Sequence, residues 1–288
     1  MLTAREVVRR LGGRATYAEV TRYATRASVR RALAAGDLHR PRRGIYVLPA
    51  LPAARVAAAR LGGVLSHTSA ARELGLELGH AEDAVHVTVP RGGRVVPEPG
   101  VVAHWKALPA EDVTGDVTTP LRTVLDCATV LPFPQALAVA DSALQLKYVG
   151  AEELVTAARS RRGPGRAACL RVAAWADHRA DNGFESVLRG TLIVAGVTDL
   201  VPQVPVRLGR FTVHVDLADV ARRIAVEGDS FTYHATRPAF TRDCERYDEL
   251  GVAGWLVLRF TWEQVAMSPA WVVDVVRRGR AGRRRRSA

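Results

Sequence analysis

Lysine, cysteine and long apolar runs are scarce in this chain. Their scarcity argues against a lysine-dependent active site beyond residue 147, a cysteine metal site and a membrane-spanning helix. Of 41 basic residues two are lysine, Lys106 and Lys147, so no lysine is present after residue 147 to transfer protons. Arginine is a poor substitute, because the guanidinium stays protonated. The three cysteines lie far apart without metal-ligand spacing, which indicates core residues in a reducing cytoplasm. No apolar run reaches the ~18–20 residues of a membrane span, and the N-terminus lacks the apolar core of a signal peptide.

Positive charge is concentrated at the two ends of the chain. The formal net charge is +12; residues 1–50 contain eleven arginines against three acids, and residues 277–286 contain seven arginines and no acid. This distribution favours a polyanionic partner. We therefore expect the chain to bind double-stranded DNA and to be cytoplasmic and nucleoid-associated. Solvated surfaces without a partner are the alternative, above all for the C-terminal run.

The first 50 residues predict a winged helix-turn-helix. Thr3 can cap a first helix, Thr16 and Glu19 form a capping box for a second, and Gly36 can end a third. A basic hairpin follows, around a turn at 41–44. The third helix and the hairpin carry most of the arginine, as a DNA-reading surface would. The candidate DNA-contacting residues are Arg26, Arg30, Arg31, Arg42 and Arg43. A protein-interaction module with arginine-rich solvent faces is the alternative.

Residues 51–160 predict mixed α/β structure. "VLSHTSAARELGL" indicates a strand running into a helix, "AVHVTVP" and "GVVAHW" indicate strands, and "TPLRTVLDCATVL" indicates a helix. The histidines of this region follow no metal-ligand template, and we interpret them as hydrogen-bonded structural residues. They are His67, His80, His86 and His104. Arg122 and Asp126, four residues apart on one predicted helix, are interpreted as a surface pair.

A third block follows the glycine- and arginine-rich segment "ARSRRGPGRAA" at 158–168. Its predicted order is α-β-β-β-α-β-α. Glu227 and Asp229 lie two residues apart in a strand, so they point to the same face roughly 7 Å apart. A short antiparallel turn would bring Asp216, near the end of the preceding strand, beside Glu227. Glu185 begins the first helix of the block.

Clustered carboxylates repel and raise each other's pKa, and a hard divalent cation resolves that repulsion. We therefore expect Asp216, Glu227 and Asp229 to bind Mg²⁺ or Mn²⁺, which can activate water and neutralise a phosphodiester. A structural network is the alternative, in which Asp216 caps a turn and Glu227 pairs with Arg246 or Arg259.

Two family resemblances rest on these motifs. Residues 180–276 resemble the PD-(D/E)XK nuclease superfamily, and within it the type similar to very-short-patch-repair endonucleases. The matching features are Glu185, Gln203, Asp216, Glu227, Asp229, His234, "FTRDCER" and "WLVLRF". The first 160 residues resemble AbiEi-type antitoxins in their winged helix and in "VLSHTSAA", "VHVTVPRGGR" and "TTPLRTVLDCA". The second resemblance implies a DNA-binding regulator associated with a toxin.

The chain departs from the nuclease pattern in two places. Asp229 stands where the superfamily has its usual lysine, and Ser230 stands where close relatives commonly have glycine. The short-patch-repair type also lacks that lysine, and the resemblance implies that His234 transfers the proton. Arg242 and Arg246 are four residues apart on a helix and could contact phosphates; pairing with Asp243 or Glu245 is the alternative.

Together these observations predict a mixed α/β (α+β) protein with four regions. These are a winged helix (1–50), an AbiEi-like α/β domain (51–160), a nuclease-like domain with a mixed sheet flanked by helices (180–279) and a basic disordered tail (280–288). The predicted function is a Mg²⁺- or Mn²⁺-dependent endodeoxyribonuclease of defence or repair, with Asp216, Glu227, Asp229, His234 and Glu185 as catalytic candidates. The alternative is a non-catalytic DNA-binding regulator with a degenerate nuclease fold. A toxin or defence-system protein encoded nearby is a candidate partner.

Overall fold

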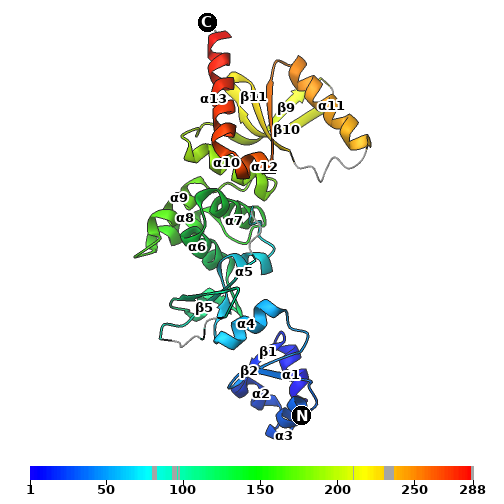
Figure 1. The fold of residues 1–288 in the computed structure, drawn as a ribbon, viewed down its shortest axis with the longest axis vertical. Helices are drawn as coiled ribbons and strands as arrows, with labels where there is room; N and C mark the ends of the chain where they lie inside the picture. Colours follow the sequence, from blue (N-terminus) through cyan, green and yellow to red (C-terminus); the bar gives the residue numbers. More distant parts are fainter. Residues whose placement is uncertain (80–82, 93–95, 97, 210, 230–236, 287–288) are drawn as a thin grey trace. The chain divides into compact units, whose positions relative to one another are not determined.

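A computed structural model gives the arrangement of the chain (Figure 1). It describes residues 1–79, 83–92, 96, 98–209, 211–229 and 237–286, with the backbone alone for 237–242 and 284–286. The described chain has the mixed α/β class that the sequence predicts. It divides into two compact units: unit 1 comprises Met1–Leu76 and Ala81–Val130, and unit 2 comprises Glu77–His80 and Leu131–Ala288.

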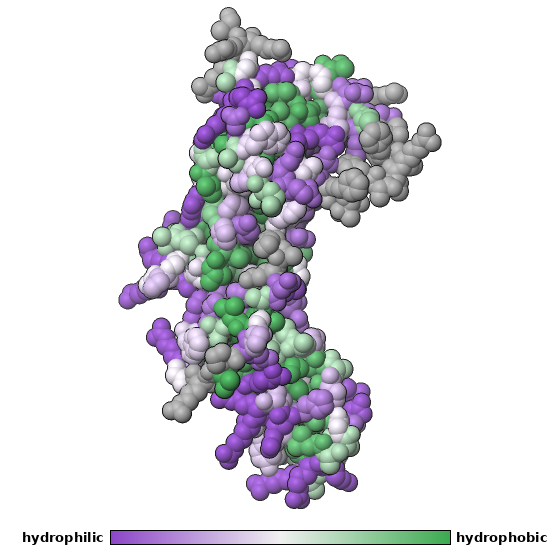
Figure 2. Space-filling view, viewed as in Figure 1, coloured by the Kyte–Doolittle hydropathy of each residue, from purple (hydrophilic) through white to green (hydrophobic). Residues whose placement is uncertain are grey.

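The first 50 residues of unit 1 form three short helices and a small antiparallel sheet, in the predicted order. The elements are α1 (Ala4–Arg10), β1 (Arg14–Thr16), α2 (Tyr17–Tyr23), α3 (Arg26–Ala34), β2 (His39–Arg42) and β3 (Ile45–Val47), and the strand order is β1-β3-β2. Thr3 pairs with Glu6, and Thr16 with Glu19, in N-terminal capping boxes. Alanine and valine side chains of the three helices pack around Leu38. Figure 2 shows hydrophilic side chains at the edges of this region's visible surface, with apolar side chains between them.

The rest of unit 1 is a mixed sheet of five described strands with helices packed against it. The elements are α4 (Ala53–Leu61), β4 (Val64–Leu65), α5 (His67–Glu73), β5 (Val85–Val89), β6 (Val101–Trp105), η1 (Ala110–Asp112), β7 (Val113–Thr114), β8 (Val117–Thr118) and α6 (Pro120–Val130). The strand order is β6-β5-β4-β8-β7, with β5 parallel to β6 and β4 parallel to β8. Strand β5 is buried from residue 86 to 89, because α4 and α5 both contact it.

Two arginine side chains join the winged-helix part of unit 1 to the turn between α4 and β4. The Nη1 of Arg42 donates to the carbonyl of Leu61 at 2.7 Å, and the Nη1 of Arg14 donates to the carbonyl of Gly63 at 2.9 Å. The intervening Gly62 has φ +72°, and a Cβ built on it would lie 2.0 Å from Arg42 Nη1. Glycine is therefore favoured here by its left-handed conformation, and a side chain at this position would displace the Arg42 guanidinium.

Unit 2 begins with helices and continues into an α/β layer. The helices are α7 (Phe133–Gln145), α8 (Ala151–Ser160), α9 (Arg166–Trp175) and α10 (Gly183–Val194). Helix α10 packs closely on α7, because Gly190 lets the backbone of Pro134 approach; a Cβ at position 190 would lie 2.6 Å from Pro134 Cα. The same two helices share a buried ion pair between Arg189 and Asp141 at 2.7 Å. These contacts fix the position of α10, which carries Glu185.

A mixed sheet of four described strands completes unit 2. The elements are β9 (Val201–Leu208), β10 (Phe211–Asp219), η2 (Val220–Arg222), β11 (Ile224–Asp229), α11 (Arg237–Val252), β12 (Leu256–Thr261), α12 (Trp262–Met267) and α13 (Pro269–Arg286). The strand order is β12-β11-β10-β9, and β11 and β12 are parallel. Helices α10, α12 and α13 pack on one face through Leu188, Val265 and Val272, and α11 packs on the other through Leu250 (Figure 1). The block has the predicted order up to β12, after which α12 precedes the predicted closing helix.

The C-terminal arginines differ from the disordered tail predicted for 280–288. Helix α13 continues to Arg286, because arginine is a good helix former and the helix is already nucleated by its packed first half. Arg280 is also tied to the body of unit 2, where its Nε lies 3.0 Å from Asp219 Oδ2. In the described part of the chain, no helix combines the length and apolar character needed to cross a membrane.

Candidate functional site

Three carboxylates from three elements of unit 2 lie close to one another. Glu185 is the third residue of α10, Asp216 lies on β10 and Glu227 on β11. The β10–β11 register aligns Leu217 with Val226, so Asp216 and Glu227 occupy the next position of the same ladder. The backbone N–H of Gly228 donates to Asp216 Oδ2 at 2.8 Å. The structure therefore brings Asp216 beside Glu227, as the sequence predicts.

A local irregularity in the sheet connects Glu185 to this ladder. Gln203 on β9 has φ +51°, and its Nε2 donates to Glu185 Oε2 at 2.8 Å. Val215 packs in the core under α11, whereas Leu217 packs in the core under α10, so β10 changes face at the residue between them. Glu185 also accepts from the backbone N–H of Asp181, at 3.0 Å. A side-chain donor on β9 and a backbone donor that precedes α10 therefore fix the Glu185 carboxylate.

Burial raises the pKa of all three carboxyl groups to about 7. Mutual repulsion adds to it: the charge of Asp216 raises the pKa of Glu185, and the charge of Glu227 raises that of Asp216. Glu185 is 5% exposed and Glu227 2% exposed. The three groups therefore resist full ionisation at neutral pH unless positive charge compensates them.

Two arginines already supply part of that charge. Arg246 of α11 donates to Glu227 Oε2 at 2.8 Å and to the carbonyl of His214 at 2.7 Å. Arg259 of β12 forms an ion pair with Asp229 and stacks on the ring of Tyr247, 4.0 Å from its centroid. The ion pair between Glu227 and Arg246, which the sequence suggested as the alternative to a metal site, is therefore formed.

One carboxylate oxygen remains without compensation. Glu227 Oε1 is buried and has no hydrogen-bond partner among the described residues. A buried acceptor without a donor is costly, and in native proteins it marks strain, function or an unseen ion. Oxygen ligands from one or two carboxylates are what Mg²⁺ takes from a protein, so Asp216 and Glu227 fit that ion.

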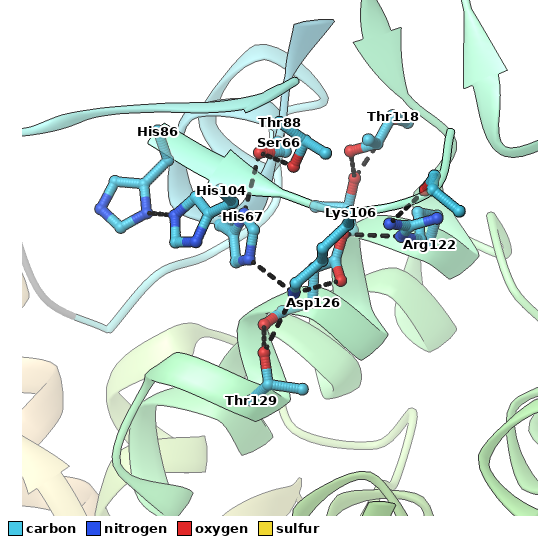
Figure 3. A network of polar contacts seen from close by, with 12 residues as sticks. Ser66, His67, His86, Thr88, His104, Lys106, Thr118, Arg122, Asp126 and Thr129 are labelled. Atoms are coloured by element: carbon cyan, nitrogen blue, oxygen red, sulfur yellow. Dashed lines mark hydrogen bonds and ion pairs between the residues drawn. The ribbon is translucent and has the colours of Figure 1, made fainter. Parts of the chain in front are cut away.

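A second buried cluster, in unit 1, was not predicted from the sequence (Figure 3). The rings of His67 and His104 stack with centroids 3.7 Å apart, and His86 Nδ1 lies 3.0 Å from His104 Nε2. Within the part of the chain that the structure describes, one set of three His, Cys, Asp or Glu ligand atoms lies within 4.8 Å of one another. That set is His67, His86 and His104. The carboxylates of unit 2 are more widely spaced than this.

A chain of polar contacts continues from the histidines to α6 (Figure 3). His67 Nε2 lies 3.2 Å from Lys106 Nζ, which donates to Asp126 Oδ1 at 2.9 Å. Arg122 Nε donates to the second oxygen of Asp126 at 2.7 Å. Asp126 is fully buried, so the interpretation of this residue and Arg122 as a surface pair is wrong. The i, i+4 spacing gave the pairing but not the burial, which comes from packing of α6 on α5.

His67 occupies an unusual backbone position in this network. It has φ +50° although it is not glycine, and it is fully buried. Burial lowers the pKa of His67 far below its ordinary value, and the neighbouring His104 and Lys106 lower that pKa further. His67 is therefore a neutral imidazole.

The comparisons with known proteins concern sequence and fold. No family model matches the chain. Two curated proteins of Mycobacterium tuberculosis, uncharacterized protein Rv2248 and uncharacterized protein MT2308, are each 30% identical over 190 residues, which is 65% of this chain and 70% of the relative. The chain belongs to the family of these two proteins. A crystal structure of the RV2827C protein from Mycobacterium tuberculosis matches with 18% identity and a TM-score of 0.32, over 69% of this chain and 82% of that one.

The remaining candidates from the sequence are placed as follows. Arg26, Arg30, Arg31, Arg42 and Arg43 are all exposed on α3 and the hairpin, although Arg42 also makes its contact to Leu61. His234 and Ser230 lie outside the described residues, as do His80 and the side chain of Arg242. The roles of these residues stay predictions.

The histidine cluster could not have been found from spacing. Its members lie on three different elements at positions 19 and 18 apart in the sequence, and only the parallel pairing of β5 with β6 and the β4–α5 turn bring them together. The one usable signal is compositional: five of the chain's eight histidines lie between residues 39 and 104.

Proposed function

We propose that this protein is a divalent-metal-dependent endonuclease whose N-terminal winged helix holds double-stranded DNA. The observation that carries the proposal is the cluster of Glu185, Asp216 and Glu227, with pKa values raised to about 7 and one buried oxygen of Glu227 unsatisfied. Such a cluster is unfavourable without a cation and fits Mg²⁺ or Mn²⁺.

Each residue of the cluster has a separate role in this proposal. Asp216 and Glu227 would hold the ion, and Asp229 completes the set if it leaves Arg259. The bound ion supplies an activated water and neutralises charge on the phosphodiester. Glu185, fixed by Gln203 and the Asp181 N–H, orients the site from the α10 side. Arg246, released from Glu227, becomes available to a phosphate oxygen. His234 is the proposed proton-transferring residue.

DNA contacts come from the exposed arginines of α3 and the hairpin in this proposal. Arginine on a helix surface and on a hairpin can neutralise phosphates, so affinity should fall steeply with salt, with a log–log slope near −0.9 per contact. Arg30→Ala combined with Arg31→Ala tests this, and equal affinity with an unchanged salt slope would remove the winged helix from the proposal. A nucleoid location in the cytoplasm and a nearby toxin or defence-system partner belong to the same proposal.

A second candidate function is a DNA-binding regulator without catalysis. Two ion pairs favour it: Arg246 binds Glu227, and Arg259 binds Asp229. In a nuclease these carboxylates would bind the metal instead. In that reading unit 2 keeps a nuclease-like arrangement as a scaffold.

A cleavage assay separates the two functions. Supercoiled, nicked and mismatched DNA are incubated with the full chain and Mg²⁺ or Mn²⁺, alongside Asp216→Asn and the control Asp274→Asn. Asp274 is 60% exposed and pairs with Arg278 on the surface of α13. The nuclease proposal expects metal-dependent cutting by wild type and the control, and none by Asp216→Asn. Calorimetry that detects no Mg²⁺ or Mn²⁺ binding to wild type, with or without DNA, would refute the nuclease and leave the regulator.

A further inference from the structure

The histidines of unit 1 form a set of nitrogen donors built by the sheet. Parallel pairing of β5 and β6 aligns His104 with Thr88, two residues after His86, so both histidine side chains reach the same side of the sheet. His67 enters from the start of α5, directly after the short strand β4. One ligand atom of each lies within 4.8 Å of the other two. Three separate elements thus converge on one point.

We propose that His67, His86 and His104 bind a divalent transition metal, and that Zn²⁺ fits this donor set. Imidazole nitrogen is a preferred ligand of zinc, whereas Mg²⁺ takes oxygen. Zinc–nitrogen bonds of about 2.0–2.1 Å in a tetrahedral site place ligand atoms roughly 3.3 Å apart. His86 Nδ1 and His104 Nε2 are 3.0 Å apart in a hydrogen bond, so a metal would displace the proton between them to solvent with only a small change in the distance between the two nitrogens. Three protein ligands leave a fourth position for water.

The backbone at His67 is a second and independent observation. A left-handed φ of +50° is sterically unfavourable for a non-glycine residue. Such strain persists where the surrounding structure imposes it, and it concentrates at functional sites. The imidazole of this fully buried residue stacks on that of His104.

Ser66 is hydrogen-bonded to one ring nitrogen of His67, Nδ1, and this leaves the other nitrogen, Nε2, facing away from Ser66. Ser66 Oγ lies 2.8 Å from His67 Nδ1, and Thr88 Oγ1 donates to the same Ser66 oxygen at 2.7 Å. Metal-binding histidines generally have the second ring nitrogen fixed in this way by a neighbouring group. The arrangement in Figure 3 therefore assigns Nε2 of His67 as its ligand atom.

Lys106 is the group that opposes metal binding. Its Nζ lies 3.2 Å from His67 Nε2, so its ammonium occupies the position beside the ligand nitrogen and repels a dication. Asp126 and Thr129 hold the same ammonium on the other side, at 2.9 and 3.5 Å. Removing the ammonium while Arg122 continues to pair with Asp126 should therefore strengthen metal binding.

The test uses the full chain and zinc alone. Competition titration against a chromophoric chelator measures Zn²⁺ affinity and stoichiometry, and the visible spectrum of the Co²⁺ form reports ligand number and geometry. We expect one ion per chain and a tetrahedral Co²⁺ spectrum. His104→Ala should weaken Zn²⁺ binding by at least about 100-fold, the upper end of what even an outer-shell change costs. His178→Ala is the matched control, since that side chain is 74% exposed in unit 2.

Two further variants keep the proposal refutable if His104→Ala fails to fold. Lys106→Met should bind Zn²⁺ about tenfold more tightly, as removal of one adjacent charge predicts; unchanged or weaker binding would overturn the proposal. Asp216→Asn should bind Zn²⁺ as wild type does, while losing the Mg²⁺ response of unit 2. Zinc binding that is lost in Asp216→Asn and kept in a folded His104→Gln protein would assign the ion to the carboxylates and reject the histidine site.

Discussion

The carboxylate cluster of unit 2 and the histidine cluster of unit 1 are both buried sets of potential ligands, but they are stabilised differently. Carboxylates ionise in water, so burying Glu227 requires a cation, and Arg246 supplies it at 2.8 Å. Histidine can be buried neutral, so His67 requires only hydrogen bonds, which Ser66 and Lys106 provide. Each cluster has a basic side chain where a metal would bind. In unit 2 that side chain neutralises a charged ligand, and in unit 1 it is hydrogen-bonded to a neutral one.

This difference predicts opposite responses to removal of the basic residue. In unit 2 the carboxylates lose a partner, so the free energy of unfolding of the metal-free protein should fall. In unit 1 the histidines lose a competitor, so metal binding should improve. The predictions that follow test this contrast, from the largest expected effect to the smallest.

Arg246→Ala should destabilise metal-free unit 2 by about 3 kcal/mol at about pH 9, roughly two units above the Glu227 pKa of about 7, because the ionised Glu227 then has no partner. Urea unfolding followed by tryptophan fluorescence measures this, since four of the five tryptophans lie in unit 2. Mg²⁺ should restore part of the loss. The control Arg278→Ala breaks an exposed pair and should cost at most about 1 kcal/mol. A loss from Arg246→Ala no larger than that of the control would mean that Glu227 is not charged in the folded protein.

Ser66→Ala should weaken Zn²⁺ binding by about 10–100-fold, because His67 loses the hydrogen bond that orients its ring. The same chelator competition measures it. Ser160→Ala is the control, because Ser160 donates only to a carbonyl of its own helix. A Ser66→Ala protein with unchanged zinc affinity would show that the neutral cluster does not depend on its hydrogen bonds in the way described above.

The contribution of Glu227 and Glu185 to the stability of the chelator-treated protein should fall as pH rises from about 4.5 to about 7. Glu227 and Glu185 have an ordinary pKa of 4.5 and a folded pKa of about 7, so in this window the folded state binds protons that the unfolded state has lost. Their contribution is thus most favourable below about pH 4.5 and is lost by about pH 7. Glu227→Gln should flatten this decline by at least about 1 kcal/mol, since one pKa unit corresponds to about 1.4 kcal/mol.

Other carboxylates act in the opposite direction, so the comparison is between Glu227→Gln and wild type at each pH, by urea unfolding. Identical pH profiles for the two proteins would contradict the raised pKa of Glu227. The neutral histidine cluster should contribute nothing to this difference.

His67→Gly should be more stable than His67→Ala by about 1 kcal/mol, because only glycine adopts φ +50° without a steric cost. Both variants remove the imidazole, so the difference isolates the backbone. Differential scanning calorimetry of the two proteins measures it. An alanine variant as stable as the glycine variant would mean that the left-handed conformation relaxes once the ring is gone.

The sequence predicts those parts of the structure that depend on local periodicity. Capping at Thr3 and Thr16 located the first helices, and the apolar residues from Ile224 to Val226 located the strand that carries Glu227 and Asp229. The antiparallel return to Asp216 was also predictable, because a short turn fixes the register of a hairpin.

Features that depend on tertiary contacts were not predictable in the same way. The burial of Asp126 follows from the packing of α6 on α5, which no spacing records. The histidine cluster requires knowing that β5 and β6 are parallel neighbours. The φ of Gln203 is likewise imposed by surrounding structure, since glutamine does not favour a left-handed backbone.

The contact between Arg42 and the end of α4 limits how this protein can be rebuilt. A chimera that exchanged residues 1–50 for the corresponding segment of another protein would need to reproduce two donors, Arg42 and Arg14, opposite the carbonyls of Leu61 and Gly63. It would also need to spare the glycine at position 62, where any side chain meets the arginine. The proposed DNA-binding segment, residues 1–50, therefore cannot be exchanged for another domain without these contacts. Its specificity would have to be altered by point substitutions on the solvent side of α3.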